Sequence, residues 1–156
     1  MNPHTRISRA EGYRQLAMYD EAMLELEEID YEDRLSKAVL ESRWRIYRDA
    51  ECWMGASAMA DAMAKRTPDS SEWRIRKAQA LRMEQGADAA LAYLLEESFE
   101  KDPAYSYEIG RFKCLTGDFA GARIAVKKAF ELDRKFRAKF VEDDDFDGVW
   151  DSFGEE

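Results

Sequence analysis

The chain has 156 residues, of which 46% are hydrophobic and 12% aromatic, so we expect a folded domain with an apolar core. Its net charge of −9 argues against nonspecific binding to nucleic acid or to anionic membranes, because both need a dominant positive field. The longest apolar run, residues 89–95, is far shorter than the ~20 residues that span a bilayer, and the first residues lack a secretory signal pattern. Together with the presence of only two cysteines, these features predict a protein of the reducing cytoplasm.

Taken in chain order, the segments that follow are all predicted to be helical. Three prolines and eight glycines separate long stretches whose apolar residues recur at helical spacing, and no convincing alternation with a period of two appears. Residues that favour helices, such as alanine, leucine, glutamate, arginine and methionine, are abundant. We therefore predict an all-α fold.

Four successive segments repeat one pattern around an alanine. These alanines are separated by 34, 34 and 32 residues and stand at Ala22, Ala56, Ala90 and Ala122. Three residues before them stand Tyr19, Trp53, Ala87 and Phe119, and four residues after them stand Leu26, Ala60, Leu94 and Val126. Positions four apart share one helix face, and an alanine lets two helices cross closely. The spacing predicts four units of two helices each, at roughly 3–35, 36–69, 70–102 and 103–134.

A period of 34 residues with two helices per unit resembles the tetratricopeptide repeat. Gly110 stands twelve residues before its alanine, as that repeat requires, and two tyrosines stand nine residues before theirs, at Tyr13 and Tyr47. The chain departs from the pattern at Trp44, where a small residue is usual, and at Glu97, where a small apolar residue is usual. The resemblance covers roughly residues 3–134. It implies a right-handed superhelical solenoid of antiparallel helix pairs, with about four helical hairpins in a single domain over residues 1–156.

Residues 135–156 do not form a further unit and are predicted to cap the last helix pair with an acidic tail. This segment resembles the one that often follows the last repeat in bacterial members of the family. We expect its aspartates to face water and four aromatic side chains to pack inward, at Phe136, Phe140, Phe146 and Trp150.

The same segment contains the beginning of a calcium-loop pattern, with acids at Asp143, Asp145 and Asp147 followed by Gly148. The glutamate that should close such a loop is replaced by Gly154. An acidic cap is therefore favoured, and a calcium-binding regulator is kept as a weak alternative.

Catalytic chemistry is not indicated by the sequence. Histidine occurs once, at His4, which argues against Ser-His-Asp and Cys-His arrangements. No phosphate-binding glycine loop, dinucleotide fingerprint or nucleophile elbow is present, and two cysteines 62 residues apart add little to a zinc site. We therefore predict a protein that is not an enzyme and that binds no cofactor and no metal.

Basic residues gather on the predicted first helices of the units. Residues 34–140 hold 21 Lys and Arg against 16 Asp and Glu, whereas residues 20–33 and 141–156 each hold eight acids and no base. First helices line a concave groove in tetratricopeptide proteins, so the resemblance implies that their arginines contact a partner. The candidate contacts are Arg45, Arg48, Arg74, Arg82 and Arg111, with Tyr47 and Tyr107 as apolar neighbours.

Stacked arginines suit an acidic peptide or a C-terminal carboxylate, which they bind through charge-assisted hydrogen bonds. A second interpretation stays equally open, in which this face is solvated and the arginines form surface ion pairs with Glu41, Asp49, Glu72 and Glu108. Tyr107 also fits a place in the core.

The resemblance and the charge pattern together predict a protein–protein interaction module. Such an adaptor or scaffold binds a protein or peptide partner of unknown identity, and neither nucleic acid nor membrane. Two further alternatives stay open: a small acidic chaperone for secretion or complex assembly, and a self-associating structural protein. One hypothesis places residues 142–156 in the groove of a neighbouring molecule, which would make a homo-oligomer.

Overall fold

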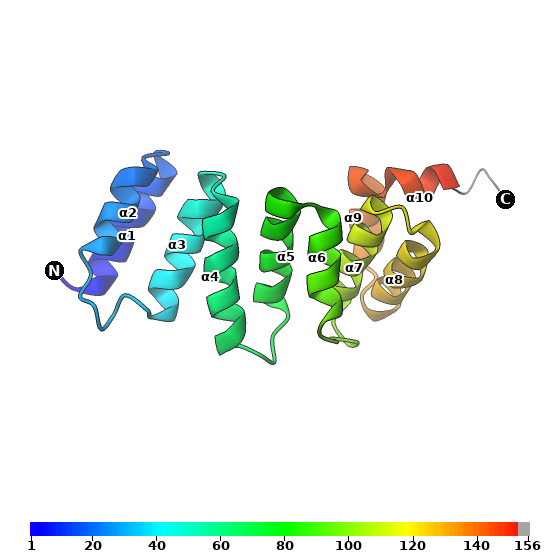
Figure 1. The fold of residues 1–156 in the computed structure, drawn as a ribbon, viewed down its shortest axis with the longest axis horizontal. Coiled ribbons are helices and arrows are strands. Elements are labelled where there is room, and N and C mark those ends of the chain that lie inside the picture. Colours follow the sequence, from blue (N-terminus) through cyan, green and yellow to red (C-terminus); the bar gives the residue numbers. More distant parts are fainter. Residues whose placement is uncertain (153–156) are drawn as a thin grey trace. The chain divides into compact units, whose positions relative to one another are not determined.

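The computed structural model describes residues 1–152, which form ten α-helices, one short 3-10 helix and no strand (Figure 1). The predicted all-α class is confirmed for this part of the chain. None of its helices combines the length and the apolar character that crossing a membrane requires. The elements are α1 (Pro3–Gln15), α2 (Tyr19–Glu27), α3 (Lys37–Asp49), α4 (Trp53–Arg66), α5 (Glu72–Gln85), α6 (Ala87–Leu95), α7 (Pro103–Leu115), α8 (Phe119–Leu132), α9 (Phe136–Glu142), η1 (Asp144–Phe146) and α10 (Asp147–Ser152).

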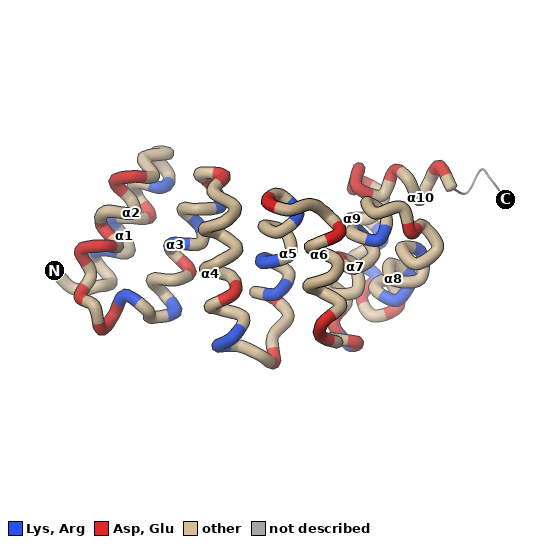
Figure 2. The backbone as a smooth tube through the Cα atoms, viewed as in Figure 1, with Lys and Arg blue, Asp and Glu red and all other residues tan. Residues whose placement is uncertain are grey.

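The contacts divide the chain into two compact units, Met1–Ala80 and Leu81–Glu156, with the division inside α5. In the first unit α1 packs against α2 and α3 against α4, and α3 also contacts both helices of the first pair. In the second unit α7 packs against α6 and α8, and the short helices α9, η1 and α10 lie against α7 and α8. Figure 2 shows acidic residues on α2 and basic residues along α3 and α5.

The second helix of every pair begins where the sequence repeat places it. Helices α2, α4, α6 and α8 start at Tyr19, Trp53, Ala87 and Phe119, three residues before the repeated alanines. Those alanines are at most 1% exposed, at Ala22, Ala56, Ala90 and Ala122. The residues four positions later are also buried, because one helical turn returns them to the same face. Glu97 is exposed because α6 already ends at Leu95, so the third unit has no inward position there.

The turn inside each helix pair contains one residue with a left-handed backbone. These residues are Ala17 (φ 57°), Glu51 (φ 56°), Gly86 (φ 101°) and Gly117 (φ 89°). Glycine adopts this conformation without steric penalty, whereas an alanine or a glutamate is strained by its Cβ. The last two pairs therefore use the residue type best suited to the turn, and the first two do not.

Trp44 occupies the position, twelve residues before the repeated alanine, that holds small residues in the other three units. Those small residues, Ala10, Ala78 and Gly110, come twelve before their own alanines. The ring of Trp44 is only 7% exposed and meets Trp73 of α5 edge-on, with centroids 5.3 Å apart. The larger side chain is thus accommodated by an aromatic pair between α3 and α5 within the first unit.

Gly110 shows how closely α7 and α8 approach. A Cβ atom added to this glycine would lie 2.8 Å from Cγ1 of Val126 and 3.3 Å from the backbone oxygen of Ala122. Neither contact is a flexible chain end that moves aside easily. The absence of a side chain at Gly110 is therefore required by the crossing of the two helices.

We expect Gly110→Ala to lower the free energy of unfolding by about 1–3 kcal/mol, because the added methyl overpacks the helix crossing. Gly12→Ala is a matched control, since a Cβ at this helical glycine meets no atom within 4 Å. The control should stabilise the protein by up to about 1 kcal/mol through helix propensity alone. Urea denaturation followed by circular dichroism measures both changes, and equal shifts in the two variants would contradict the close crossing.

Candidate functional site

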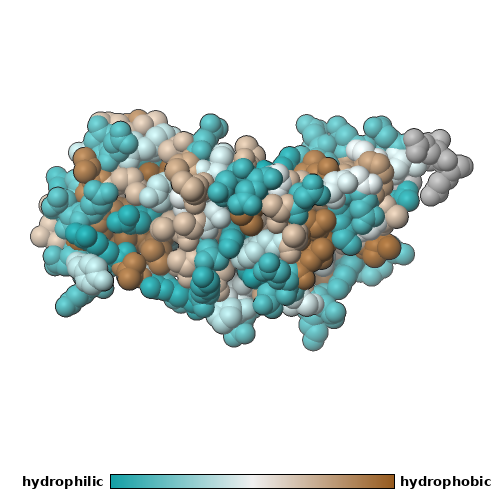
Figure 3. All heavy atoms as spheres, in the orientation of Figure 1, coloured by the Kyte–Doolittle hydropathy of each residue, from teal (hydrophilic) through white to brown (hydrophobic). Residues whose placement is uncertain are grey.

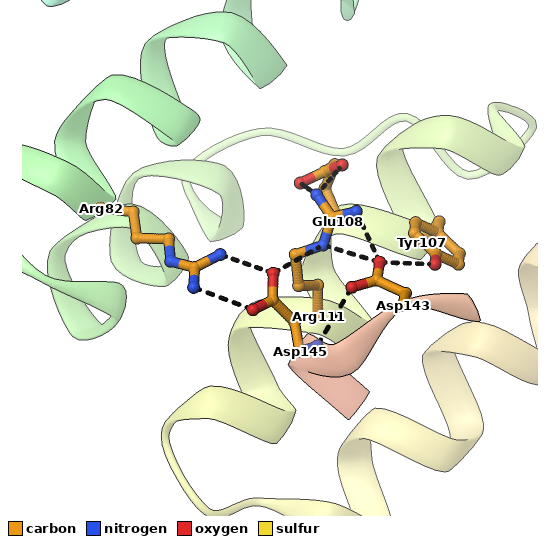
Figure 4. A network of polar contacts seen from close by, with 6 residues as sticks. All are labelled: Arg82, Tyr107, Glu108, Arg111, Asp143 and Asp145. Atoms are coloured by element: carbon orange, nitrogen blue, oxygen red, sulfur yellow. Dashed lines mark hydrogen bonds and ion pairs between the residues drawn. The ribbon is translucent and has the colours of Figure 1, made fainter. Parts of the chain in front are cut away.

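Two of the predicted contact residues, Arg82 and Arg111, bind aspartates of the chain's own C-terminal segment (Figure 4). Arg82 at the end of α5 donates from Nη1 and Nη2 to the two carboxylate oxygens of Asp145, at 2.6 and 2.9 Å. This is a bidentate pair, the geometry in which arginine binds a carboxylate most strongly. All residues of this network belong to the second compact unit.

Arg111 of α7 lies at the centre of the network. Its Nη1 donates to both carboxylate oxygens of Glu108 at 2.7 and 2.9 Å, one helical turn earlier. Its Nη2 and Nε donate to Oδ2 of Asp143 at 2.7 and 3.2 Å, and Nε also lies 3.4 Å from Asp145. The side chains of Arg111, Glu108 and Asp143 are only 13%, 4% and 13% exposed. One guanidinium thus neutralises two carboxylates that are largely removed from water.

Tyr107 is fully buried and belongs to the apolar core of the second unit. Its ring centroid lies 5.2 Å from those of Phe136 and Phe146. Its hydroxyl donates to Oδ2 of Asp143 at 2.8 Å, so the polar end of the ring joins the charged network. Of the two interpretations left open for this residue, the structure places it in the core.

The pKa values of the network follow from burial and hydrogen bonding. Burial opposes ionisation of Asp143, but hydrogen bonds from Arg111 and Tyr107 outweigh it and hold the pKa of this carboxyl below its ordinary value. Burial and the hydrogen bond to Asp143 raise the pKa of the Tyr107 hydroxyl. The bidentate bond to Asp145 raises the pKa of Arg82. These three groups therefore keep their usual charge at neutral pH.

The acidic segment is held in place by apolar side chains as well as by charge. Phe140, Phe146 and Val149 are buried against the cluster that contains Tyr107. Oδ1 of Asp143 accepts a hydrogen bond from the backbone N–H of Asp145 at 3.1 Å and so caps η1. The aspartates at 143 and 145 do not face water as expected, because this cap and these anchors turn them towards α5 and α7.

An open depression of about 400 Å³ lies beside the network, lined by Arg111, Lys139, Glu142, Asp143, Asp144 and Asp145. Within residues 1–152 no group of three or more His, Cys, Asp or Glu side chains is placed to hold a metal ion. Two of the carboxylates expected to begin a calcium loop, Asp143 and Asp145, bind arginines. Gly154, which breaks the loop pattern, lies outside the described residues.

Two other predicted contacts, Arg45 and Arg48, project from α3 in the first unit. Arg45 pairs with Glu41 one turn earlier at 2.9 Å, and its side chain is 45% exposed. Arg48 pairs with the adjacent Asp49 at 2.9 Å and is 42% exposed. The Arg45–Glu41 pair is an exposed local ion pair of the kind that contributes little to stability, whereas Asp49 is partly buried and also binds Arg14. The surface-pair interpretation and the contact interpretation therefore stay compatible for both arginines.

Tyr47 and Arg74 complete the predicted set. The Tyr47 ring packs over Gly55 of α4, where an added Cβ would come within 2.6 Å of it. Arg74 is partly buried on α5. The first unit thus presents Arg45 and Arg48, while Tyr47 serves the packing of α3 on α4.

Sequence reasoning did not include Arg76 of α5 among the site residues, although it stacks on two tryptophans. The guanidinium carbon of Arg76 lies 4.5 Å from the ring centroid of Trp44 and 4.4 Å from that of Trp73. Arg48 lies over the same Trp44 ring at 4.7 Å. The spacing of four residues between Trp44 and Arg48 is a signal that could have found one half of this stack.

No family model, curated protein or solved structure matches this chain.

We expect Arg111→Gln to lower the free energy of unfolding by about 3 kcal/mol, because it leaves the buried carboxylates of Glu108 and Asp143 without their cation. Arg45→Gln is the control, since it removes an exposed pair worth at most about 1 kcal/mol. Both values are measured by urea denaturation. Similar losses in the two variants would show that the Arg111 network is not a buried one.

Acid should weaken the second unit through Asp143. The folded state holds the pKa of this carboxyl below its ordinary value, so the unfolded chain takes up the proton first as the pH falls. The contribution is complete above about pH 4 and is lost as the pH falls further. Asp143→Asn should therefore lose less stability than wild type between neutral and acidic pH. Asp144→Asn removes the same charge from an exposed neighbour. If acid destabilised that variant as little as it destabilises Asp143→Asn, the pH dependence would not belong to Asp143.

Proposed function

We propose that this chain is a tetratricopeptide-like module of the cytoplasm that binds an acidic segment of a partner protein. The proposal includes the arrangement of the helices, which is a right-handed superhelix of four antiparallel helix pairs with a C-terminal cap. Its support is the regular start of the second helices and the burial of the repeated alanines. Two unpaired cysteines, Cys52 and Cys114, support the reducing compartment.

One observation carries the proposal about the partner. Arg82 and Arg111, on the first helices of two successive pairs, hold Asp145 and Asp143 at the start of the short 3-10 helix η1. Arginines at these places in the fold are therefore suited to carboxylates that are two residues apart. In the second unit the chain itself supplies those carboxylates, so a partner requires arginines elsewhere.

Arg45 and Arg48 are the arginines that we assign to the partner. Their carboxylate neighbours Glu41 and Asp49 are close in sequence, and each pair occupies one nitrogen of the guanidinium. A guanidinium carries five N–H donors, so carboxylates of a partner can bind without breaking these pairs. The second unit shows the stronger arrangement, in which an arginine is enclosed by acids from another element.

Recognition by charge also fits the surface of the molecule. On the face drawn in Figure 3, hydrophobic residues form separate small patches divided by hydrophilic ones. Exposed large hydrophobic residues such as Leu24, Met54 and Ile124 come from different helices. Larger continuous apolar patches are typical of surfaces that bind partners by hydrophobic contact. We therefore propose a partner that is bound mainly through its acids.

The proposal is tested by affinity capture from the native lysate, followed by binding measurements with the acidic segment of the captured protein. The variant Arg45→Glu/Arg48→Glu should lose at least tenfold in affinity, because it places negative charge against the partner's acids. The control Lys37→Glu/Arg43→Glu reverses the same charge at two other positions of α3 and should keep the wild-type affinity. A partner bound equally by wild type and both variants contradicts the proposed function.

A further inference from the structure

The first unit contains a pair of arginines stacked on a buried tryptophan. The guanidinium carbons of Arg48 on α3 and Arg76 on α5 lie 4.7 and 4.5 Å from the ring centroid of Trp44. Because both distances are measured to the same point, the two carbons lie at most about 9 Å apart. Two cationic groups from different helices are thus brought together by one ring.

The tryptophans hold these arginines in position. Trp44 and Trp73 are 7% and 5% exposed, and their rings meet edge-on at 5.3 Å, so neither ring is free to turn. Arg76 contacts both rings, which adds a second stacking contact for its guanidinium. A stacked guanidinium is already ordered, so less side-chain entropy is lost when it binds a ligand.

Both arginines keep hydrogen-bond donors for a ligand. Arg48 uses Nε for Asp49, and Arg76 uses Nη2 for Glu72 at 2.8 Å. Among the described residues, the buried side-chain nitrogen or oxygen that lacks a partner is Nε of Arg6. The remaining nitrogens of Arg48 and Arg76 are therefore not sealed from water, and they can donate to an approaching carboxylate.

The second unit supplies the pattern of ligand that such a pair accepts. There, one arginine from each of two successive first helices holds one aspartate of the i, i+2 pair Asp143 and Asp145. These two aspartates lie at the start of the 3-10 helix η1, so they reach both arginines from one short turn. The guanidinium carbons of Arg48 and Arg76 lie at most about 9 Å apart, so one short acidic segment can likewise reach both.

We infer that Arg48, Arg76 and Trp44 form an anchor for two carboxylates, two residues apart, in a short acidic segment of the partner. The inference rests on the proposed function and names the chemistry that the partner must carry. The negative charges of Asp49 and Glu72 beside the anchor reduce its net positive charge. A lone anion or a nucleic acid, which is attracted mainly by net charge, therefore binds the anchor weakly. Paired carboxylates instead gain directional bonds from both arginines.

The anchor is tested with a fluorescein-labelled peptide that copies residues 141–147, VEDDDFD, and with a second peptide, VENNNFN, in which the aspartates become asparagines. Fluorescence anisotropy at low salt measures the affinity, and tryptophan emission reports whether the surroundings of Trp44 change. Wild type should bind the first peptide at least tenfold more tightly than the second. Arg48→Gln and Arg76→Gln should each weaken binding at least fivefold, and Arg43→Gln, which removes a charge from the same helix, should change it less than twofold.

Two further variants keep the result interpretable. Arg76→Lys retains the charge but loses the planar stack, so it should bind more weakly than wild type while its helical circular dichroism is unchanged. Arg82→Gln tests the second unit, and it should leave binding of the peptide intact. A loss confined to Arg82→Gln would overturn the inference, because the peptide would then be competing with the chain's own acidic segment.

Failure of the anchor and failure of the proposed function give different results. If wild type does not bind the peptide, or if Arg48→Gln and Arg76→Gln bind it as wild type does, the anchor is wrong. The proposed function then still depends on whether Arg45→Glu/Arg48→Glu releases the captured partner. If that variant also keeps its partner, the proposed function fails as well.

Discussion

Close approach of the two helices in each pair is the constraint on which the rest of the structure depends. The repeated alanines are fully buried, and at Gly110 not even a methyl group fits against Val126. Because small residues occupy the crossing of α7 and α8, the charged side chains of α7 are displayed on its other faces. Arg111 follows Gly110 directly, and its guanidinium leaves α7 on the side that meets the C-terminal segment. Tight packing on one side of the helix thus determines where its charges are displayed.

The two units satisfy their arginines in different ways. In the second unit Arg82 and Arg111 are neutralised by aspartates, and the segment that carries these aspartates is anchored by Phe146. In the first unit Arg48 and Arg76 stack on Trp44 and pair with acids close by in sequence. Carboxylates fill the bidentate positions of the second unit, whereas donors stay open in the first. The same side-chain chemistry therefore serves stability in one unit and, in our proposal, recognition in the other.

Much of the fold could be predicted from sequence because it is specified locally. Residues three to seven positions apart lie on one helix face, so the start of α4 at Trp53 and the burial of Ala56 follow from spacing alone. The contacts of Asp143 and Asp145 could not be predicted in this way, since Arg111 and Arg82 lie 32 and 63 residues earlier. Charge complementarity indicates that the acidic tail suits the arginines. Whether the tail binds the arginines of its own chain or those of a neighbouring molecule depends on the buried side chains of Phe140 and Phe146 and on the cap formed by Asp143.

The C-terminal segment also covers the outer side of the last helix pair described. Helices α9 and α10 cover α8, and α10 also covers α7, so the surface on which a fifth pair would stack is already occupied. The fit is close, because a Cβ at Gly148 would lie 2.5 Å from the ring of Phe119. A further helix pair can therefore stack on α7 and α8 only if this segment is first displaced from them.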